Sequence, residues 1–164
     1  MFDKFVFIAV MGVVALGASS VWAADDARSS IHISANIPTQ QFHVQPRNPD
    51  FGKDEYMYYD PIRNDLSVLR ETFDVKNTDG SVHAYLPAGH PWLTNGRDVI
   101  PLLVRFNNVT LLATPLEVVD DATSTPGTQA EMVIRAATAP LPTQTGLYNA
   151  DITVIFDAVP RVNP

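Results

Sequence analysis

An antiparallel β-sandwich is the fold that this sequence predicts. Several short stretches alternate apolar and polar residues, which is the pattern of a strand with one buried face. The chain also contains 13 prolines and 8 glycines, and prolines at this spacing would interrupt long helices. No stretch shows a convincing helical period. With 164 residues, the chain is long enough for one domain with a hydrophobic core.

The first segment, residues 1–23, has the composition of a secretory signal peptide. Lys4 gives a weakly basic start, an apolar run follows, and small residues end the segment at Ala23. The apolar run is too short to span a bilayer as a helix. We therefore expect export with cleavage after Ala23 or, as the alternative, after Ala24.

Charge and cysteine content narrow the class of protein further. A formal net charge of −7 argues against nucleic acid or an anionic membrane surface as the main partner. The chain has no cysteine, which excludes disulfides, cysteine-based zinc sites and thiol catalysis. An exported domain of this size must then draw its stability from core packing, a metal or a partner chain.

The first strand is expected directly behind the signal peptide and a short polar lead. Residues 31–37 alternate apolar and polar side chains without a break, and Pro38 ends the run. This strand can be the first edge strand of its own sheet, or it can complete the sheet of a neighbouring copy by β-augmentation. Full burial of each isoleucine would contribute about 1.5–3 kcal/mol in either case. The face that would be buried consists of Ile31, Ile33, Ala35 and Ile37.

The next part of the chain is expected to hold a hairpin. Residues 41–53 contain two prolines among polar side chains and should be irregular. Val68 to Lys76 and Ser81 to Leu86 are β-prone runs that flank Asp79 and Gly80. An Asp-Gly pair between two such runs is a strong local signal for a tight β-hairpin.

Three further strands are expected in the second half, separated by loops. Residues 87–98 and 114–128 are rich in turn-forming residues and should be loops. The buried faces of the strands are expected to be, in order, Ile100, Leu102, Val104 and Phe106; then Met132, Ile134 and Ala136; and last Tyr148, Ala150, Ile152, Val154 and Phe156.

The sequence contains no group of residues with the spacing of a known catalytic or metal-binding motif. The 4 histidines are scattered, no serine-nucleophile motif occurs, and the pair Asp120-Asp121 is better explained as a solvated acidic turn than as a glycosidase pair. We therefore expect no enzyme, no cofactor and no bound metal. The aromatic residues Tyr56, Tyr58 and Tyr59 are in a β-sandwich more often core or edge packing than a sugar-binding platform. The alternative function is a self-contained secreted β-sandwich that binds a ligand or carbohydrate.

Four groups of residues, taken in order, resemble a known family: the major subunits of alpha-class fimbriae, the colonization factor antigen and coli surface antigen pili of the alternate chaperone–usher pathway. The resemblance covers nearly the whole chain after the signal peptide. The groups are Ile31 to Pro38; Tyr59-Asp60-Pro61 with Val75 to Asp79; Ile100 to Phe106 with Leu111-Leu112; and Met132-Val133-Ile134 with Pro142 to Tyr148 and Ile152 to Phe156.

The resemblance implies an incomplete immunoglobulin-like antiparallel β-sandwich that lacks its final strand and is completed by donor-strand exchange. Residues 24–38 would then be the donor segment and residues 39–164 the pilin domain. The donor side chains would be Ile31, Ile33, Ala35 and Ile37, and the acceptor groove would include Ile152, Val154 and Phe156. If the tail from Ala158 to Pro164 folded back into the groove, the domain would complete itself instead.

The implied function is that of a structural subunit of a bacterial fimbria that supports adhesion. Its expected partners are identical pilin subunits in a homopolymer, a periplasmic chaperone, an outer-membrane usher and, at the end of the fimbria, a tip adhesin. The expected route is export through the periplasm to the cell surface.

Overall fold

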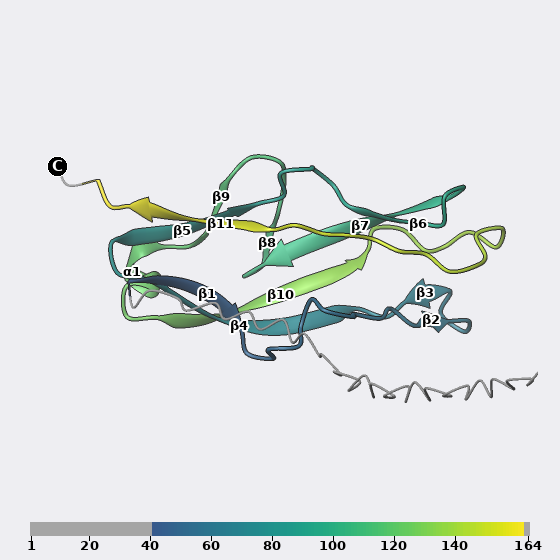
Figure 1. The fold of residues 1–164 in the computed structure, drawn as a ribbon, viewed down its shortest axis with the longest axis horizontal. Helices are drawn as coiled ribbons and strands as arrows, with labels where there is room; N and C mark the ends of the chain where they lie inside the picture. Colours follow the sequence, from purple (N-terminus) through teal and green to yellow (C-terminus); the bar gives the residue numbers. More distant parts are fainter. Residues whose placement is uncertain (1–40, 163–164) are drawn as a thin grey trace, which may run out of the picture. The chain divides into compact units, whose positions relative to one another are not determined.

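Antiparallel β-sheets form the regular structure of residues 41–162 apart from one short helix; these are the residues that the computed structural model describes (Figure 1). The predicted signal peptide and the predicted donor strand lie outside them. The larger sheet has the order β1 (Phe42–Pro46), β4 (Leu69–Asn77), β10 (Thr128–Ala136), β7 (Val99–Phe106) and β6 (Trp92–Thr94), with β8 (Val109–Thr110) also paired to β7.

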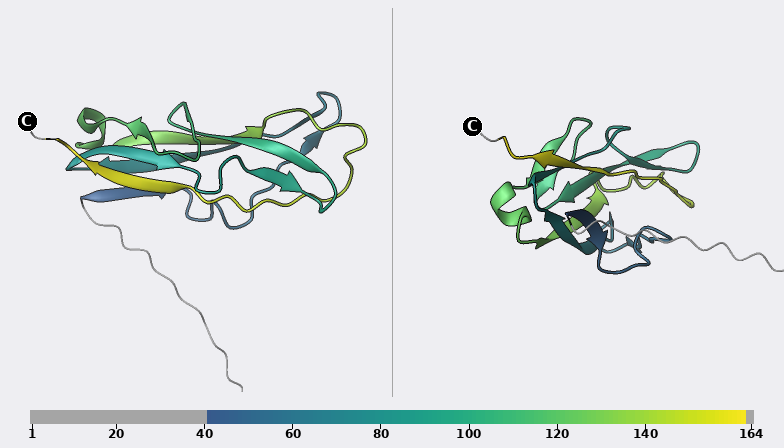
Figure 2. Two further views of the ribbon diagram at one scale, coloured as in Figure 1. Left: turned by 90° about the horizontal axis from the view of Figure 1, so that it is seen from above. Right: turned by 60° about the vertical axis from the view of Figure 1, so that its left-hand side comes forward.

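A second sheet and a short ribbon complete the architecture. The second sheet has the order β11 (Ile155–Pro160), β5 (Gly80–Tyr85) and β9 (Leu116–Val119), and the ribbon pairs β2 (Tyr59–Asp60) with β3 (Asp65–Leu66). Figures 1 and 2 show β5 and β11 on one side of the core and β4 and β10 on the other. The described residues contain one helix, α1 (Asp121–Ser124). It is neither long nor apolar enough to cross a membrane.

The core lies between the two sheets, and the alternating faces predicted for β7 and β10 point into it. Leu102, Val104 and Phe106 of β7 are almost completely buried, and Met132 and Ile134 of β10 pack in the same cluster. Val82 and Ala84 of β5 complete the cluster from the opposite sheet. The prediction of an antiparallel β-sandwich is therefore confirmed.

The predicted hairpin around Asp79-Gly80 is wrong, because the chain crosses there from one sheet to the other. β4 pairs with β1 and β10, whereas β5 pairs with β11 and β9. A type I′ hairpin needs a positive φ at both central residues, and neither Asp79 nor Gly80 has one. The side chain of Asn77 holds the crossover instead, by donating to the carbonyl of Ser81 and accepting from the N–H of Asp79.

The tight hairpin lies further along, at Asn107-Asn108. Both residues have positive φ values, 47° and 66°, and they connect Phe106 of β7 to its partner Val109 of β8. Asparagine tolerates this left-handed conformation better than most residues do, which suits the type I′ geometry.

Three segments expected to be irregular contain regular structure. β1 lies within residues 41–53, β6 within residues 87–98, and β9 with α1 within residues 114–128. β1 and β6 are the edge strands of the larger sheet, and a proline such as Pro46 is tolerated at an edge. The acidic pair begins the helix: Asp120 accepts a 2.8 Å hydrogen bond from the N–H of Thr123 as its N-cap.

The last strand begins later and ends later than predicted. β11 covers Ile155–Pro160, whereas the preceding residues 148–154 take part in no ladder beyond one bridge between Asn149 and Thr94. The partner strand β5 ends at Tyr85, and the chain then turns through Pro87, so no strand is available at that level. Ala158 belongs to β11 and pairs with Val82, so this part of the tail does not fold back into a groove.

Candidate functional site

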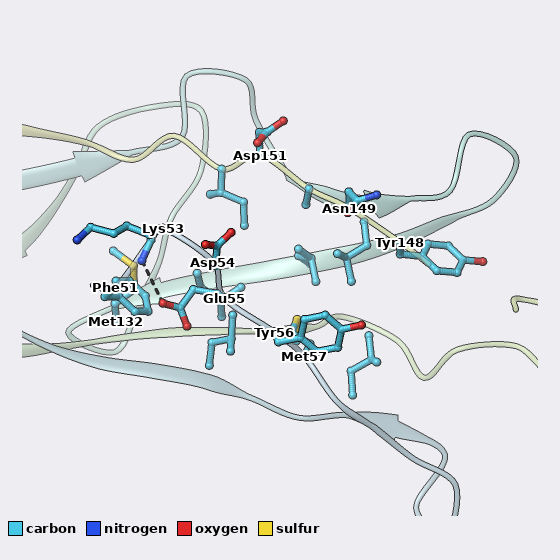
Figure 3. Close-up of a pocket in the computed structure, with 18 of the residues that line it drawn as sticks. Phe51, Lys53, Asp54, Glu55, Tyr56, Met57, Met132, Tyr148, Asn149 and Asp151 are labelled. Atoms are coloured by element: carbon cyan, nitrogen blue, oxygen red, sulfur yellow. Dashed lines mark hydrogen bonds between the residues drawn. The ribbon is translucent and has the colours of Figure 1, made fainter. Parts of the chain in front are cut away.

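A large groove runs along one side of the sandwich, where no strand of residues 41–162 joins the two sheets. Its volume is about 1000 Å³. One wall is the segment 51–59, and the other is the segment 146–156, which leads into β11. Figure 3 shows the two walls, with Phe51, Glu55 and Met57 on one side and Tyr148, Asn149 and Asp151 on the other.

The floor of the groove is the hydrophobic core itself. Phe73 of β4, Leu102 of β7 and Met132 of β10 reach the groove from the larger sheet. Phe73 lies 5.9 Å from Phe51 between ring centroids, in an edge-to-face arrangement that joins the floor to the first wall. The groove is therefore an opening into the core rather than a surface depression.

The second wall contains the three residues that the sequence analysis predicted for the acceptor groove. Ile152, Val154 and Phe156 all line the groove, and each is a partly buried residue packed against the core. The Phe156 ring lies 4.9 Å from that of Phe106 and 6.2 Å from that of Phe73. Apolar side chains that are only partly buried leave apolar area exposed to water, and covering that area would be favourable.

The backbone of β11 has a free edge on the side of the groove. Arg161 donates its N–H to the carbonyl of Asp79 at 2.6 Å, and these two residues continue the register in which Pro160 lies opposite Gly80. Hydrogen-bonded and non-hydrogen-bonded pairs alternate in an antiparallel ladder. The N–H and C=O groups of Phe156 and Ala158 therefore point away from β5, and no strand of the described residues pairs with that edge.

Polar groups surround the mouth of the groove without closing it. Asp54, Glu55 and Asp151 are exposed, and the carboxylate of Glu55 accepts a 3.1 Å hydrogen bond from the N–H of Gly52. Burial raises the pKa of the Tyr148 phenol, and the negative charge of Asp98 adds to this rise. The hydroxyl of Tyr148 is buried and has no hydrogen-bond partner among the described residues.

The tyrosines considered for sugar binding belong to this same groove. Tyr56, Tyr58 and Tyr59 line it near one end and are more than half exposed. The rings of Tyr56 and Tyr58 lie 5.2 Å apart, and the hydroxyl of Tyr59 donates to the side chain of Asn64. Within residues 41–162, no three His, Asp or Glu side chains are placed to hold a metal ion.

The first wall was not predicted from the sequence, and the predicted donor strand is untested. Phe51 stands alone between Asp50 and Gly52, and Met57 lies between Tyr56 and Tyr58, so no alternation marks either residue as buried; their apolar character is the available signal. The predicted donor residues Ile31, Ile33, Ala35 and Ile37 lie outside the described residues, and their role remains a prediction.

Comparison with known proteins gives a consistent picture. A family model described as CS1 type fimbrial major subunit matches residues 27–157. The fold is similar to the structure of the CooA pilin subunit from enterotoxigenic Escherichia coli, with a TM-score of 0.56 and 19% sequence identity, covering 70% of this chain and 86% of that one. A comparison with curated proteins gives no match. The family match extends over most of the chain, including both walls of the groove.

Proposed function

We propose that this chain, which belongs to the CS1 type fimbrial major subunit family, polymerises by taking the N-terminal strand of the next copy into its groove. As a member of that family it is a structural subunit of a surface fimbria built from identical copies. In this proposal, residues 31–37 of one subunit pair with the free edge of β11 in another. The structural role of the family also supports the expectation that the chain is not an enzyme.

One observation carries this proposal: an apolar groove and an unpaired strand edge occur at the same place. The N–H and C=O groups of Phe156 and Ala158 offer hydrogen bonds to an added strand, and the partly buried side chains below them offer apolar contacts. An extended peptide with alternating apolar side chains satisfies both requirements at once. A small-molecule ligand would leave the backbone edge unpaired.

The predicted donor strand fits these requirements in length and pattern. At 3.4 Å per residue, residues 31–37 span about 20 Å as a strand. Ile152, Val154 and Phe156 repeat with the same period of two residues as Ile31, Ile33, Ala35 and Ile37. Burial of three isoleucines at about 1.5–3 kcal/mol each would make the contact durable.

Such a groove also calls for protection before assembly. An exposed apolar groove and a free strand edge are aggregation hazards in a monomer. A periplasmic chaperone that covers both, and an outer-membrane usher that exchanges it for the donor strand, would provide that protection. We propose this route for the chain, with residues 1–23 as its signal peptide, and a tip adhesin as a further partner at the end of the fimbria.

Truncation tests the proposal. The mature chain 24–164 and the truncated chain 39–164 are compared by light scattering and thermal unfolding, and a synthetic peptide of residues 29–39 is then added to the truncated chain. The proposal predicts polymers from the mature chain and an unstable monomer from the truncated chain, which the peptide stabilises. A mature chain that stays a stable monomer, with a truncated form that ignores the peptide, would support the self-contained binding module instead.

A further inference from the structure

The β2–β3 ribbon and the loop that follows β10 reach the same end of the described residues (Figure 1), and both segments carry exposed apolar side chains. Ile62, in the turn between β2 and β3, is 95% exposed, and Tyr58 is 69% exposed. We call this surface the apolar end; its members are Tyr56, Tyr58, Tyr59, Ile62, Leu141 and Leu147. Large apolar side chains exposed at one end of a domain are typical of an interaction site.

The apolar end is continuous with the groove. Tyr56, Tyr58, Tyr59 and Leu147 line one end of the groove as well as being exposed, whereas Ile62 and Leu141 lie beyond it. A strand that fills the groove would therefore leave or enter it next to this patch. The body to which that strand is attached would come close to the same surface.

The direction of β11 indicates which end of the strand lies there. β11 runs from the side of the apolar end toward α1 (Figure 1): its last residue, Pro160, pairs with Gly80, whose carbonyl accepts a hydrogen bond from the hydroxyl of Ser124 in α1. All strand pairs of the described residues are antiparallel, and antiparallel pairing is also slightly more stable per residue. A donor strand antiparallel to β11 starts beside α1 and ends, with Ile37, at the apolar end.

The short connection behind the donor strand then limits where the donating subunit can lie. Five residue steps from Ile37 to Phe42 reach at most about 18 Å. Phe42 opens β1 opposite Asn77, and the carbonyl of Gln41 accepts a 2.9 Å hydrogen bond from the N–H of Thr78. The donor strand therefore leaves its own subunit at the end that carries α1 and the turn Thr78–Gly80, which we call the α1 end.

We propose that the apolar end is the docking surface for the α1 end of the next copy, so that the bodies of successive subunits touch where the donor strand passes between them. This inference rests on the proposed strand exchange and adds a second contact to it, between the bodies of the subunits. A head-to-tail contact of this kind uses two different surfaces and repeats without closing, which produces a filament.

Engineered cysteines test the contact, because the chain has none of its own. The double-cysteine variant carries Ile62→Cys at the apolar end and Asp79→Cys at the α1 end. β4, with nine residues, separates these ends by about 27 Å, which is too far for a disulfide within one subunit. Oxidised polymers of the mature variant should therefore give a ladder of covalent multimers on a non-reducing gel. Asp79→Cys alone, and Asp79→Cys with Leu112→Cys on another part of the surface, should give monomers.

A second variant measures the contribution of the patch without touching the groove. Ile62→Ser with Leu141→Ser should shorten the polymers several-fold, while the affinity of the truncated chain 39–164 for the peptide 29–39 stays unchanged. Polymers of normal length from this serine variant, together with no covalent ladder from the double-cysteine variant, overturn the inference alone. Efficient dimers of Asp79→Cys alone overturn it too, since they place two α1 ends together. A mature chain that forms no polymers contradicts the strand exchange as well.

Discussion

The guanidinium group of Arg161 binds both carboxylate oxygens of Asp121, with distances of 2.9 Å from Nε to Oδ2 and 2.7 Å from Nη2 to Oδ1. Nη2 also donates to the hydroxyl of Thr125 at 3.1 Å. Arg161 directly follows β11, and Asp121 opens α1. This bidentate pair therefore fixes the end of the strand whose free edge faces the groove.

Acid should weaken this attachment. The hydrogen bond from Arg161 lowers the pKa of Asp121 below its ordinary value, and the hydroxyl of Thr125 lowers it further. A lowered pKa in the folded state gives a stabilisation that is present above the unfolded-state pKa, about 3.9, and is lost as the pH falls through the lower folded-state value. We expect Asp121→Asn to reduce the unfolding temperature of the peptide-bound chain 39–164 at pH 7 and to bring it closer to wild type at low pH. The exposed Asp54→Asn serves as the control, and an equal deficit of Asp121→Asn at both pH values would contradict the assignment.

Gly80 should not tolerate a side chain. A methyl group on Gly80 would meet the carbonyl oxygen of Val159 and stand 2.6 Å from the backbone nitrogen of Arg161. Because these are backbone atoms of β11 and its extension, the strand itself would have to shift. We expect Gly80→Ala to reduce the free energy of unfolding by about 1–3 kcal/mol and to weaken peptide binding. Denaturant unfolding measures this, with Thr78→Ala as the neighbouring control; an unperturbed Gly80→Ala would show that β11 does not need this close approach.

Phe156 should matter more once the groove is filled. Its ring packs against those of Phe73 and Phe106, yet it is only partly buried. With the peptide bound, Phe156→Ala should cost about 3–5 kcal/mol, and the loss should be smaller in the truncated chain alone. Val99→Ala, at an exposed position, should have little effect in either state. Equal losses with and without peptide would mean that the donor does not cover Phe156.

The donor peptide should show the period of a strand. Ile33→Ala in the peptide removes apolar area that would be buried in the groove, and we expect a loss of about 2 kcal/mol, or roughly 30-fold in Kd. His32→Ala lies on the opposite face and should change Kd little. Isothermal titration with the truncated chain measures both peptides. Similar Kd values for the two would argue against an alternating set of apolar contacts.

Burial was predictable where a strand's own pattern determines it. β7 and β10 alternate strictly, and their predicted faces do form the core. The hairpin predicted at Gly80 is wrong, because the close approach of β11 requires a glycine there, and that requirement is not visible in the local Asp-Gly signal. The last strand was predicted to begin at Tyr148, since the alternation continues although β5 offers no partner at that level.

The two walls of the groove differ in what the sequence reveals. Alternation predicts that Ile152, Val154 and Phe156 share one face, and all three line the groove; their role as an acceptor for a donor strand comes from the family resemblance and stays a prediction. Phe51 and Met57 reach it from a segment without periodicity, and only the tertiary fold brings them opposite the other wall.

Amide hydrogen exchange at the free edge of β11 tests the central claim most directly. The N–H groups of Phe156 and Ala158 face away from β5, whereas that of Asp157 faces it in the register of the pair. In the truncated chain 39–164, we expect Phe156 and Ala158 to exchange rapidly while Asp157 is protected, and the peptide 29–39 should then protect all three. A peptide that binds without slowing exchange at Phe156 and Ala158 would contradict the account, because no strand would have been added to that edge.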